Sequence, residues 1–107
     1  MLQVGELSLQ VIDALRPLIP QIRSKDRSLA DQLVRSATSV ALNIGEGDLS
    51  DPGNQRSRFF TAAGSANETL MALRVAARWG YLPPDAGQAA EELLRRVIAM
   101  LWKLTRR

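Results

Sequence analysis

The sequence predicts an all-α protein, an antiparallel up-down-up-down four-helix bundle. Four segments repeat apolar residues with the helical period of about 3.6, and no segment alternates apolar and polar residues as a strand does. Short turn-rich loops join the four segments, which makes consecutive helices antiparallel neighbours. The 107 residues suffice for one hydrophobic core, so we expect a single domain over residues 1–107.

The first helix is expected to run from about Leu7 to Ile22. Its apolar stripe has spacings of three and four residues and consists of Leu7, Val11, Leu15, Leu18 and Ile22. Pro17 lies inside this helix and should kink it, because proline lacks a backbone donor. Pro20 and the polar residues 23–26 should end it.

The second helix is expected to begin at Ser28, whose hydroxyl can cap the free amides. Asp31, three positions later, completes a capping-box pattern in its Asp form. The expected buried stripe is Leu29, Leu33, Ala37, Val40 and Ile44. Gly45 and Gly47 weaken the helix, and turn-forming residues at 48–54 follow it.

The third helix is expected from about Gln55 to Trp79, with Gly80 at its C-cap. Its expected inward residues are Phe59, Ala63, Ala66, Leu70, Leu73 and Ala77. Residues 81–84, which include two prolines, force the chain out of helix, and Asp85 can cap the last helix. The stripe of the last helix is Ala90, Leu93, Leu94, Val97, Leu101 and Leu104.

The composition argues against catalysis. The chain contains no Cys and no His, so it lacks a thiolate, the commonest metal ligand and the usual general base. We therefore expect no enzyme, no catalytic residue, no metal site and no cofactor. Glu46 and Glu68 are the only mid-chain carboxylates that could bind a hard cation. No apolar run is long enough to span a bilayer and no signal peptide is evident, which predicts a cytoplasmic protein.

Basic charge gathers in the second half of the chain. Residues 1–53 hold five basic and seven acidic side chains, whereas residues 54–107 hold nine basic and four acidic ones. Such an imbalance is typical of a protein with a polyanionic partner, usually nucleic acid. On helical geometry, the last helix presents one basic face, made of Arg95, Arg96, Lys103, Arg106 and Arg107. The third helix aligns Arg56, Arg74 and Arg78, whereas Arg58 points elsewhere.

These basic residues have two interpretations. Guanidinium groups suit phosphate oxygens, so the rows could follow a nucleic-acid backbone, and Trp102 could stack on an exposed base. Alternatively, the arginines form a solvated face that Glu91 and Glu92 partly neutralise, and Trp102 is an aromatic residue at the edge of the core or at a subunit interface.

Residues 35–47 form a distinctive motif, rich in small residues. It begins with Arg35 and ends in a helix-end signal, Asn43, Ile44, Gly45, Glu46 and Gly47. Farther on come Phe59-Phe60, Gly64-Ser65, Glu68 and Gly80-Tyr81-Leu82. With these motifs, residues 8 to 104 resemble the four-helix-bundle family of the 23S rRNA intervening-sequence proteins. That family includes the accessory variability determinant of diversity-generating retroelements.

The resemblance implies a homo-oligomeric barrel, typically a pentamer, with a basic surface that binds RNA or DNA and no catalytic activity. It also implies a reverse transcriptase as a partner of some members. The expected function is therefore a non-catalytic, oligomeric nucleic-acid-binding scaffold, with RNA favoured. The sequence itself permits close helix contact at its small residues, and Leu42 lies off the buried stripe, as an interface residue would.

The motif residues also have two interpretations. Asn43 and Glu46 could form a polar site for a ligand or partner. The favoured interpretation is structural: they bond to the backbone or near Arg35 and Glu68, because buried polar groups must be paired. Gly47, Gly64 and Ser65 are likewise expected to serve packing. A rival function is a protein-interaction adaptor, for example for a retroelement reverse transcriptase, with Leu42, Leu49 and Trp102 as its exposed apolar candidates.

Overall fold

The computed structural model describes residues 2–106, and within them every regular element is helical. This confirms the all-α prediction. The elements are α1 (Gln3–Leu15), α2 (Ile19–Lys25), α3 (Arg27–Asp48), α4 (Pro52–Arg78) and α5 (Gln88–Thr105). Five helices therefore replace the four that we expected, because the first predicted helix is divided.

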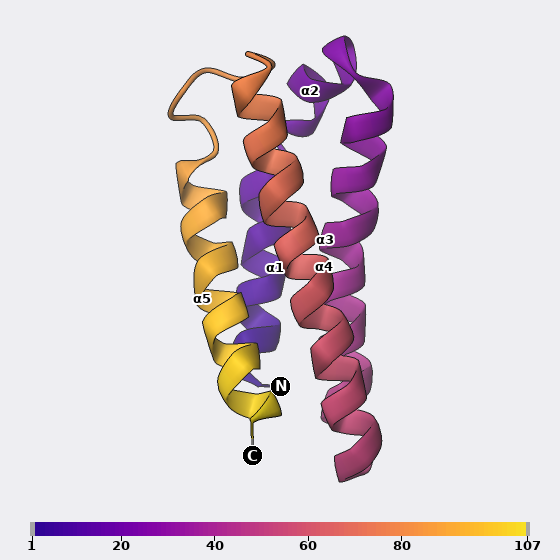
Figure 1. Ribbon diagram of the computed structural model, residues 1–107. Coiled ribbons are helices and arrows are strands. Elements are labelled where there is room, and N and C mark those ends of the chain that lie inside the picture. The colour runs from indigo at the N-terminus through magenta and orange to yellow at the C-terminus, as the bar shows by residue number, and fades with distance from the viewer. Residues whose placement is uncertain (1, 107) are drawn as a thin grey trace.

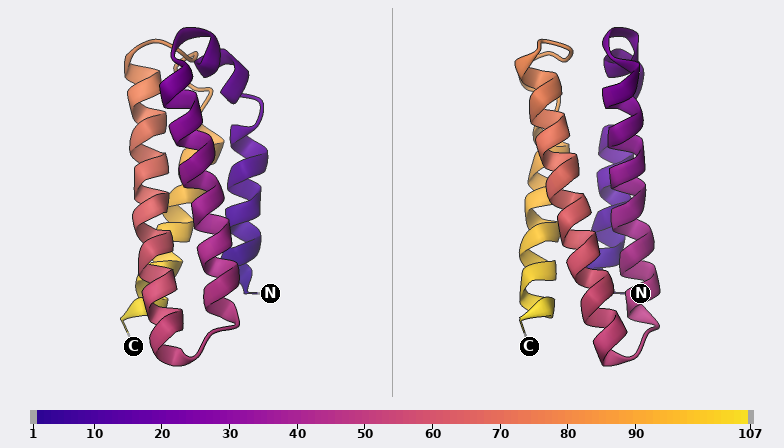
Figure 2. Two further views of the ribbon diagram at one scale, coloured as in Figure 1. Left: turned by 90° about the vertical axis from the view of Figure 1, so that its right-hand side faces the viewer. Right: turned by 45° about the vertical axis from the view of Figure 1, so that its right-hand side comes forward.

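The four longer helices lie side by side, and each runs antiparallel to the next one along the chain (Figures 1 and 2). α3 packs against α4, α4 against α5, α5 against α1, and α1 against α3, so these helices surround one core. The molecule is elongated, with extents of 42 × 21 × 19 Å, and both chain ends lie at the same end of it (Figure 1). No helix in residues 2–106 is long and apolar enough to span a membrane.

The first predicted helix breaks at Pro17 and is not merely kinked there. α1 ends at Leu15 and α2 begins at Ile19. Proline removes a hydrogen bond and its ring clashes with the carbonyl four residues earlier, which explains the break. Pro20, which we expected to end the helix, lies in the first turn of α2, where no backbone donor is needed. The apolar stripe crosses the break intact, because Ile22 is still buried.

The N-caps differ from the predicted ones. Asp26, not Ser28, caps α3, and its carboxylate accepts a hydrogen bond of 3.0 Å from the Leu29 amide. Asp31 therefore has no capping role and pairs with Arg23 of α2. Each of these caps depends on the backbone conformation of the residue before the helix, which the capping pattern alone does not specify.

The starts of α4 and α5 also differ from the predicted ones. Asp51 caps α4, so this helix begins three residues before the predicted Gln55. Hydrogen bonds from Asn54 lower the pKa of the Asp51 carboxyl. Asp85 does not cap α5; its carboxylate accepts a hydrogen bond of 3.3 Å from the Gln88 side chain instead.

The predicted buried stripes of α1 and α3 are buried in full. On α4 the inward face is rotated slightly, so that Ala77 is exposed and Ala62, Thr69 and Ala76 are buried instead. Gly80 follows α4 with a φ of 79°, as expected for a helix that ends in a left-handed glycine. This turn sends the chain toward α5.

Small residues let α3 and α4 approach closely. A Cβ on Gly47 would lie 2.7 Å from the ring of Phe59, which only glycine avoids. Farther along the same contact, the buried Thr69 hydroxyl lies 2.7 Å from the Ser36 hydroxyl. The predicted close contact at small residues is therefore present within the chain, between these two helices.

Candidate nucleic-acid interface

The outer face of α5 carries the predicted basic residues. Its opposite side packs into the core through Ala90, Leu94, Val97, Leu101 and Thr105. The exposed side chains of this helix include the acidic Glu92. The basic ones are Arg95, Arg96, Lys103 and Arg106, with Trp102 53% exposed beside them. We call these five residues the α5 basic face. The structure therefore brings four of the predicted cations onto one surface.

One carboxylate neutralises part of this charge. The Arg95 guanidinium donates to Glu91 Oε1 at 2.9 Å, and Arg74 of α4 donates to the same oxygen from two nitrogens at 2.9 and 3.3 Å. These hydrogen bonds hold the pKa of Glu91 below its usual value. Two arginines thus share one negative charge, so Glu91 partly neutralises the start of α5, as the alternative interpretation expected.

The second half of the α5 basic face keeps its charge. Within residues 2–106, Arg96, Lys103 and Arg106 form no ion pair. The Arg106 guanidinium lies over the ring of Trp102 at 4.8 Å from its centroid. This cation–π contact holds a cation and an exposed aromatic ring together, the combination that suits phosphate and base in a nucleic acid.

The other predicted basic residues are spread along α4, and Arg74 is linked through Glu91 to Arg95 of the α5 basic face. Arg56 is near the start of α4, with its guanidinium 5.7 Å from the Phe60 ring centroid. Arg78 is at the far end of the same helix, and 22 residues of helix correspond to about 33 Å. The alignment of Arg56 with Arg74 and Arg78 therefore does not make one compact site. Arg107 lies outside the described residues.

The family-motif residues form a row of polar contacts between α3 and α4, which we call the polar ladder. Arg35 forms an ion pair with Glu68, which also accepts a hydrogen bond of 3.3 Å from Gln32. The hydroxyls of Ser39 and Ser65 lie 2.9 Å apart in the middle of the ladder. These contacts join the two helices along their shared edge.

Asn43 and Glu46 continue the ladder toward the end of α3. The Asn43 amide donates to the Ser39 carbonyl at 2.9 Å, which is the backbone contact that we favoured. Glu46 pairs at 2.9 Å with Arg58, which also donates to Asn43 at 3.4 Å. Neither residue contacts Arg35 or Glu68. The sequence analysis missed the role of Arg58. The available signal was that Glu46 lies near the end of one helix and Arg58 near the start of the next, so that a short loop brings the two close together.

The described residues contain no group of three or more carboxylates that could hold a metal ion. Glu46 and Glu68, the candidate pair, each bind a different arginine instead. What this region can do chemically is therefore to hold two helices in register.

Exposed apolar side chains follow the outer sides of α3 and α4. Leu42 is 61% exposed, as its position off the buried stripe predicted, and Leu49, an apolar candidate at the end of α3, is 91% exposed. Sequence reasoning missed a row on α4, Met71, Val75 and Trp79, of which Trp79 is 72% exposed. Its four-residue spacing was the available signal, but an apolar row at helical spacing is equally typical of a core.

Comparison with known proteins identifies relatives over nearly the whole chain. The model of the family described as 23S rRNA-intervening sequence protein matches residues 2–103. A solved structure, a protein of unknown function from the S23 ribosomal protein family of Bacteroides thetaiotaomicron, has the same fold with a TM-score of 0.88. The two chains are 20% identical, and the match covers 97% of this chain and 99% of the other. No curated protein matches the chain.

Proposed function

We propose that this chain, which belongs to the 23S rRNA-intervening sequence protein family, is a non-catalytic, cytoplasmic nucleic-acid-binding protein that acts as a homo-oligomer. The observation that carries this proposal is the α5 basic face. Three of its cations have no acidic partner within residues 2–106, and an exposed Trp102 lies among them. Phosphate oxygens would supply the missing acceptors.

RNA is the favoured nucleic acid. The α5 basic face lies on the surface of a single helix, and it offers charge and one exposed ring but no row of amide side chains for reading base edges. Such a surface suits recognition of backbone shape and of unstacked bases, which structured RNA presents in its loops. The name of the family, which refers to 23S rRNA, points in the same direction.

Assembly would strengthen this binding. One chain carries a net charge of only +3, and five copies, the number expected from the family resemblance, would carry five times that charge. Support for assembly comes from Gly45 and Gly64, which lie exposed within α3 and α4. A Cβ on either would meet nothing within 4 Å. Helical glycine costs about 1 kcal/mol relative to alanine, and packing within the chain does not require it here.

The test is RNA binding by a charge-reversal variant. We expect Arg96→Glu combined with Lys103→Glu to weaken binding of a structured RNA at least tenfold. It should also flatten the dependence of log Kd on log salt by about one to two units, since each lost phosphate contact removes about 0.7–0.9. Fluorescence anisotropy at low and near-physiological salt measures both effects, with a DNA duplex of matching sequence as the comparison.

The matched control is Arg16→Glu combined with Arg27→Glu, which makes the same charge change on exposed residues of other elements. It should retain most of the affinity. Equal loss in both variants would mean that only net charge matters and would contradict the α5 basic face. No RNA binding by the wild-type protein, even at low salt, would contradict the function itself.

A second candidate function is a protein-interaction adaptor, for example for a reverse transcriptase. The specific observation in its favour is the exposed apolar row Met71, Val75 and Trp79 on α4. Soluble monomers rarely expose contiguous apolar surface without a partner. This function would be favoured over the first if the purified oligomer does not bind RNA and a protein partner co-purifies with it in stoichiometric amount.

A further inference from the structure

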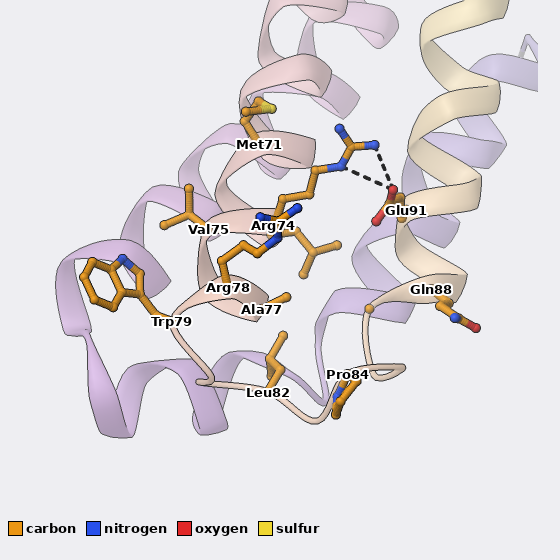
Figure 3. A pocket seen from close by; sticks show the side chains of 12 residues that line it. Met71, Arg74, Val75, Ala77, Arg78, Trp79, Leu82, Pro84, Gln88 and Glu91 are labelled. Atoms are coloured by element: carbon orange, nitrogen blue, oxygen red, sulfur yellow. Dashed lines mark hydrogen bonds and ion pairs between the residues drawn. The ribbon is translucent and has the colours of Figure 1, made fainter.

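A cleft of about 640 Å³ opens where the end of α4 meets the loop to α5 and the first turns of α5 (Figure 3). Its volume falls within the range of about 300–1,000 Å³ that is typical of ligand sites. Lys103 and Arg106 of the α5 basic face are distant from the cleft, because α5 begins beside the cleft and runs to the other end of the molecule (Figure 1). Arg96 is nearer, about 8 Å beyond Glu91 along the helix axis.

The backbone turn after α4 creates the cleft. Gly80, at a φ of 79°, directs the loop away from the helix axis, and Leu82 then turns inward and is 5% exposed. Gly87 lets the start of α5 approach α4, since a Cβ there would lie 3.3 Å from Leu73. Between these fixed points, Ala77 and Pro84 remain exposed and form apolar walls.

Charge at the cleft is positive and only partly compensated. Arg74 and Arg78 lie one turn apart on α4 and extend on the same side of it (Figure 3). Glu91 is the one carboxylate that lines the cleft, and Arg74 together with Arg95 already occupies it. Arg78 is exposed and forms no ion pair within residues 2–106. Its guanidinium therefore offers a place for one added anion beside apolar walls.

We propose that this cleft binds an acidic, apolar peptide segment of a protein partner. A carboxylate of the segment pairs with Arg78, and its neighbouring apolar side chain lies against Ala77, Leu82 and Pro84. Further apolar side chains of the segment can continue onto the exposed Met71 and Val75 of α4, in the manner of a helix laid into a groove.

The chemistry of the lining favours a peptide over a nucleotide. The walls beside the two arginines are aliphatic, whereas a base needs a flat aromatic partner. Trp79, the one aromatic residue of the lining, points away from the side of the cleft where Arg74 of α4 meets Glu91 of α5 (Figure 3). Five residues separate Arg74 from Trp79, about 140° around the helix, so the ring does not face that side.

The test uses a fluorescein-labelled amphipathic peptide built from Glu, Leu and Ala, with the full chain and anisotropy as the readout. We expect it to bind at least tenfold tighter than the same peptide with Lys in place of Glu, or with Ser in place of Leu. Arg78→Glu should weaken binding of the Glu–Leu–Ala peptide at least tenfold. Arg27→Glu, the same charge change at an exposed residue of α3, should leave it within twofold.

Several outcomes would overturn the proposal. Equal affinity for the Ser-containing peptide would show general charge attraction, and an unchanged affinity in Arg78→Glu would place binding elsewhere. Displacement of the peptide by a structured RNA, together with loss of RNA affinity in Arg78→Glu, would assign the cleft to nucleic acid. A changed oligomeric mass in that variant would assign the cleft to a second copy of the chain.

The same measurements separate this proposal from the proposed function. Arg96→Glu combined with Lys103→Glu is expected to lose RNA and to keep the peptide, and Arg78→Glu is expected to do the reverse. If wild-type protein binds the peptide but no RNA, the cleft proposal is supported and the proposed RNA binding is wrong. If it binds RNA but not the peptide, only the cleft proposal is wrong.

Discussion

At the scale of single residues, Glu91 decides how much charge the surface presents. It lies four residues before Arg95 on α5 and faces Arg74 across the α4–α5 contact, so one carboxylate accepts from both guanidinium groups. Such a partly exposed network is worth little in stability. Its larger consequence is electrostatic, because it leaves Arg96, Lys103 and Arg106 as the uncompensated cations of α5.

We predict that Glu91→Gln lowers the free energy of unfolding by less than about 1 kcal/mol at pH 7. The folded-state pKa of Glu91 is depressed, so its stabilising contribution is present above the unfolded-state pKa and is lost as pH falls through the folded-state pKa. The difference between wild type and variant should therefore be smaller at about pH 3 than at pH 7. Urea unfolding at the two pH values measures it, and a difference that is undiminished at the lower pH would contradict the pairing.

Glycine positions show that the same residue type serves different purposes. Gly47 is required within the chain, because a side chain there would collide with Phe59. Gly45 and Gly64 meet nothing within 4 Å, so their reason must be sought outside the folded chain. Sequence alone could not separate these cases, since all three glycines stand in segments with helical periodicity.

At the scale of elements, proline and aspartate set the helix boundaries. Pro17 divides the first predicted helix and Pro20 starts α2, while Asp26 and Asp51 cap α3 and α4. The predicted start of α3 was wrong because two residues could compete for its cap. Ser28 and Asp26 both have side-chain oxygens, and only the extended backbone at Asp26 (φ −154°, ψ 95°) places an oxygen near the free amides.

We predict that Asp26→Ala lowers the free energy of unfolding by about 1 kcal/mol, because the Leu29 amide loses its acceptor. Ser28→Ala, the matched control at the cap that the sequence predicted, should change stability by less than about 0.5 kcal/mol. Chemical denaturation monitored by circular dichroism compares the two. A larger loss of stability in Ser28→Ala than in Asp26→Ala would show that Ser28 caps α3.

At the scale of the whole molecule, the surface has three regions of different chemistry. The second half of α5 is basic, the junction of α4 and α5 is a cleft with apolar walls, and the outer sides of α3 and α4 expose apolar and small residues. The buried sides of the helices pack together in one shared hydrophobic core. These are the surfaces that we propose for RNA, a peptide and a second copy of the chain, respectively.

We predict that the wild-type protein has a solution mass several times the 11.8 kDa of one chain. Gly64→Val should shift that mass toward one chain, because a branched side chain would block close approach of a second copy. Ala99→Val, an exposed small residue on α5, is the matched control and should leave the mass unchanged. Light scattering after size exclusion, without RNA, measures it. A wild-type mass of one chain would contradict assembly.

The sequence by itself determined the helical class, the buried stripes of α1 and α3 and the glycine end of α4, because each depends on local periodicity or local backbone conformation. It also placed the cations of α5 on one face. The Glu91–Arg95 pair likewise follows from local i,i+4 spacing. Only the tertiary structure decided that Arg74 shares this carboxylate, since it reaches Glu91 from α4 to α5, two helices whose relative rotation and register no local pattern specifies. The cleft has the same origin: it exists because the loop after Gly80 and the close approach at Gly87 hold α4 and α5 at a fixed separation.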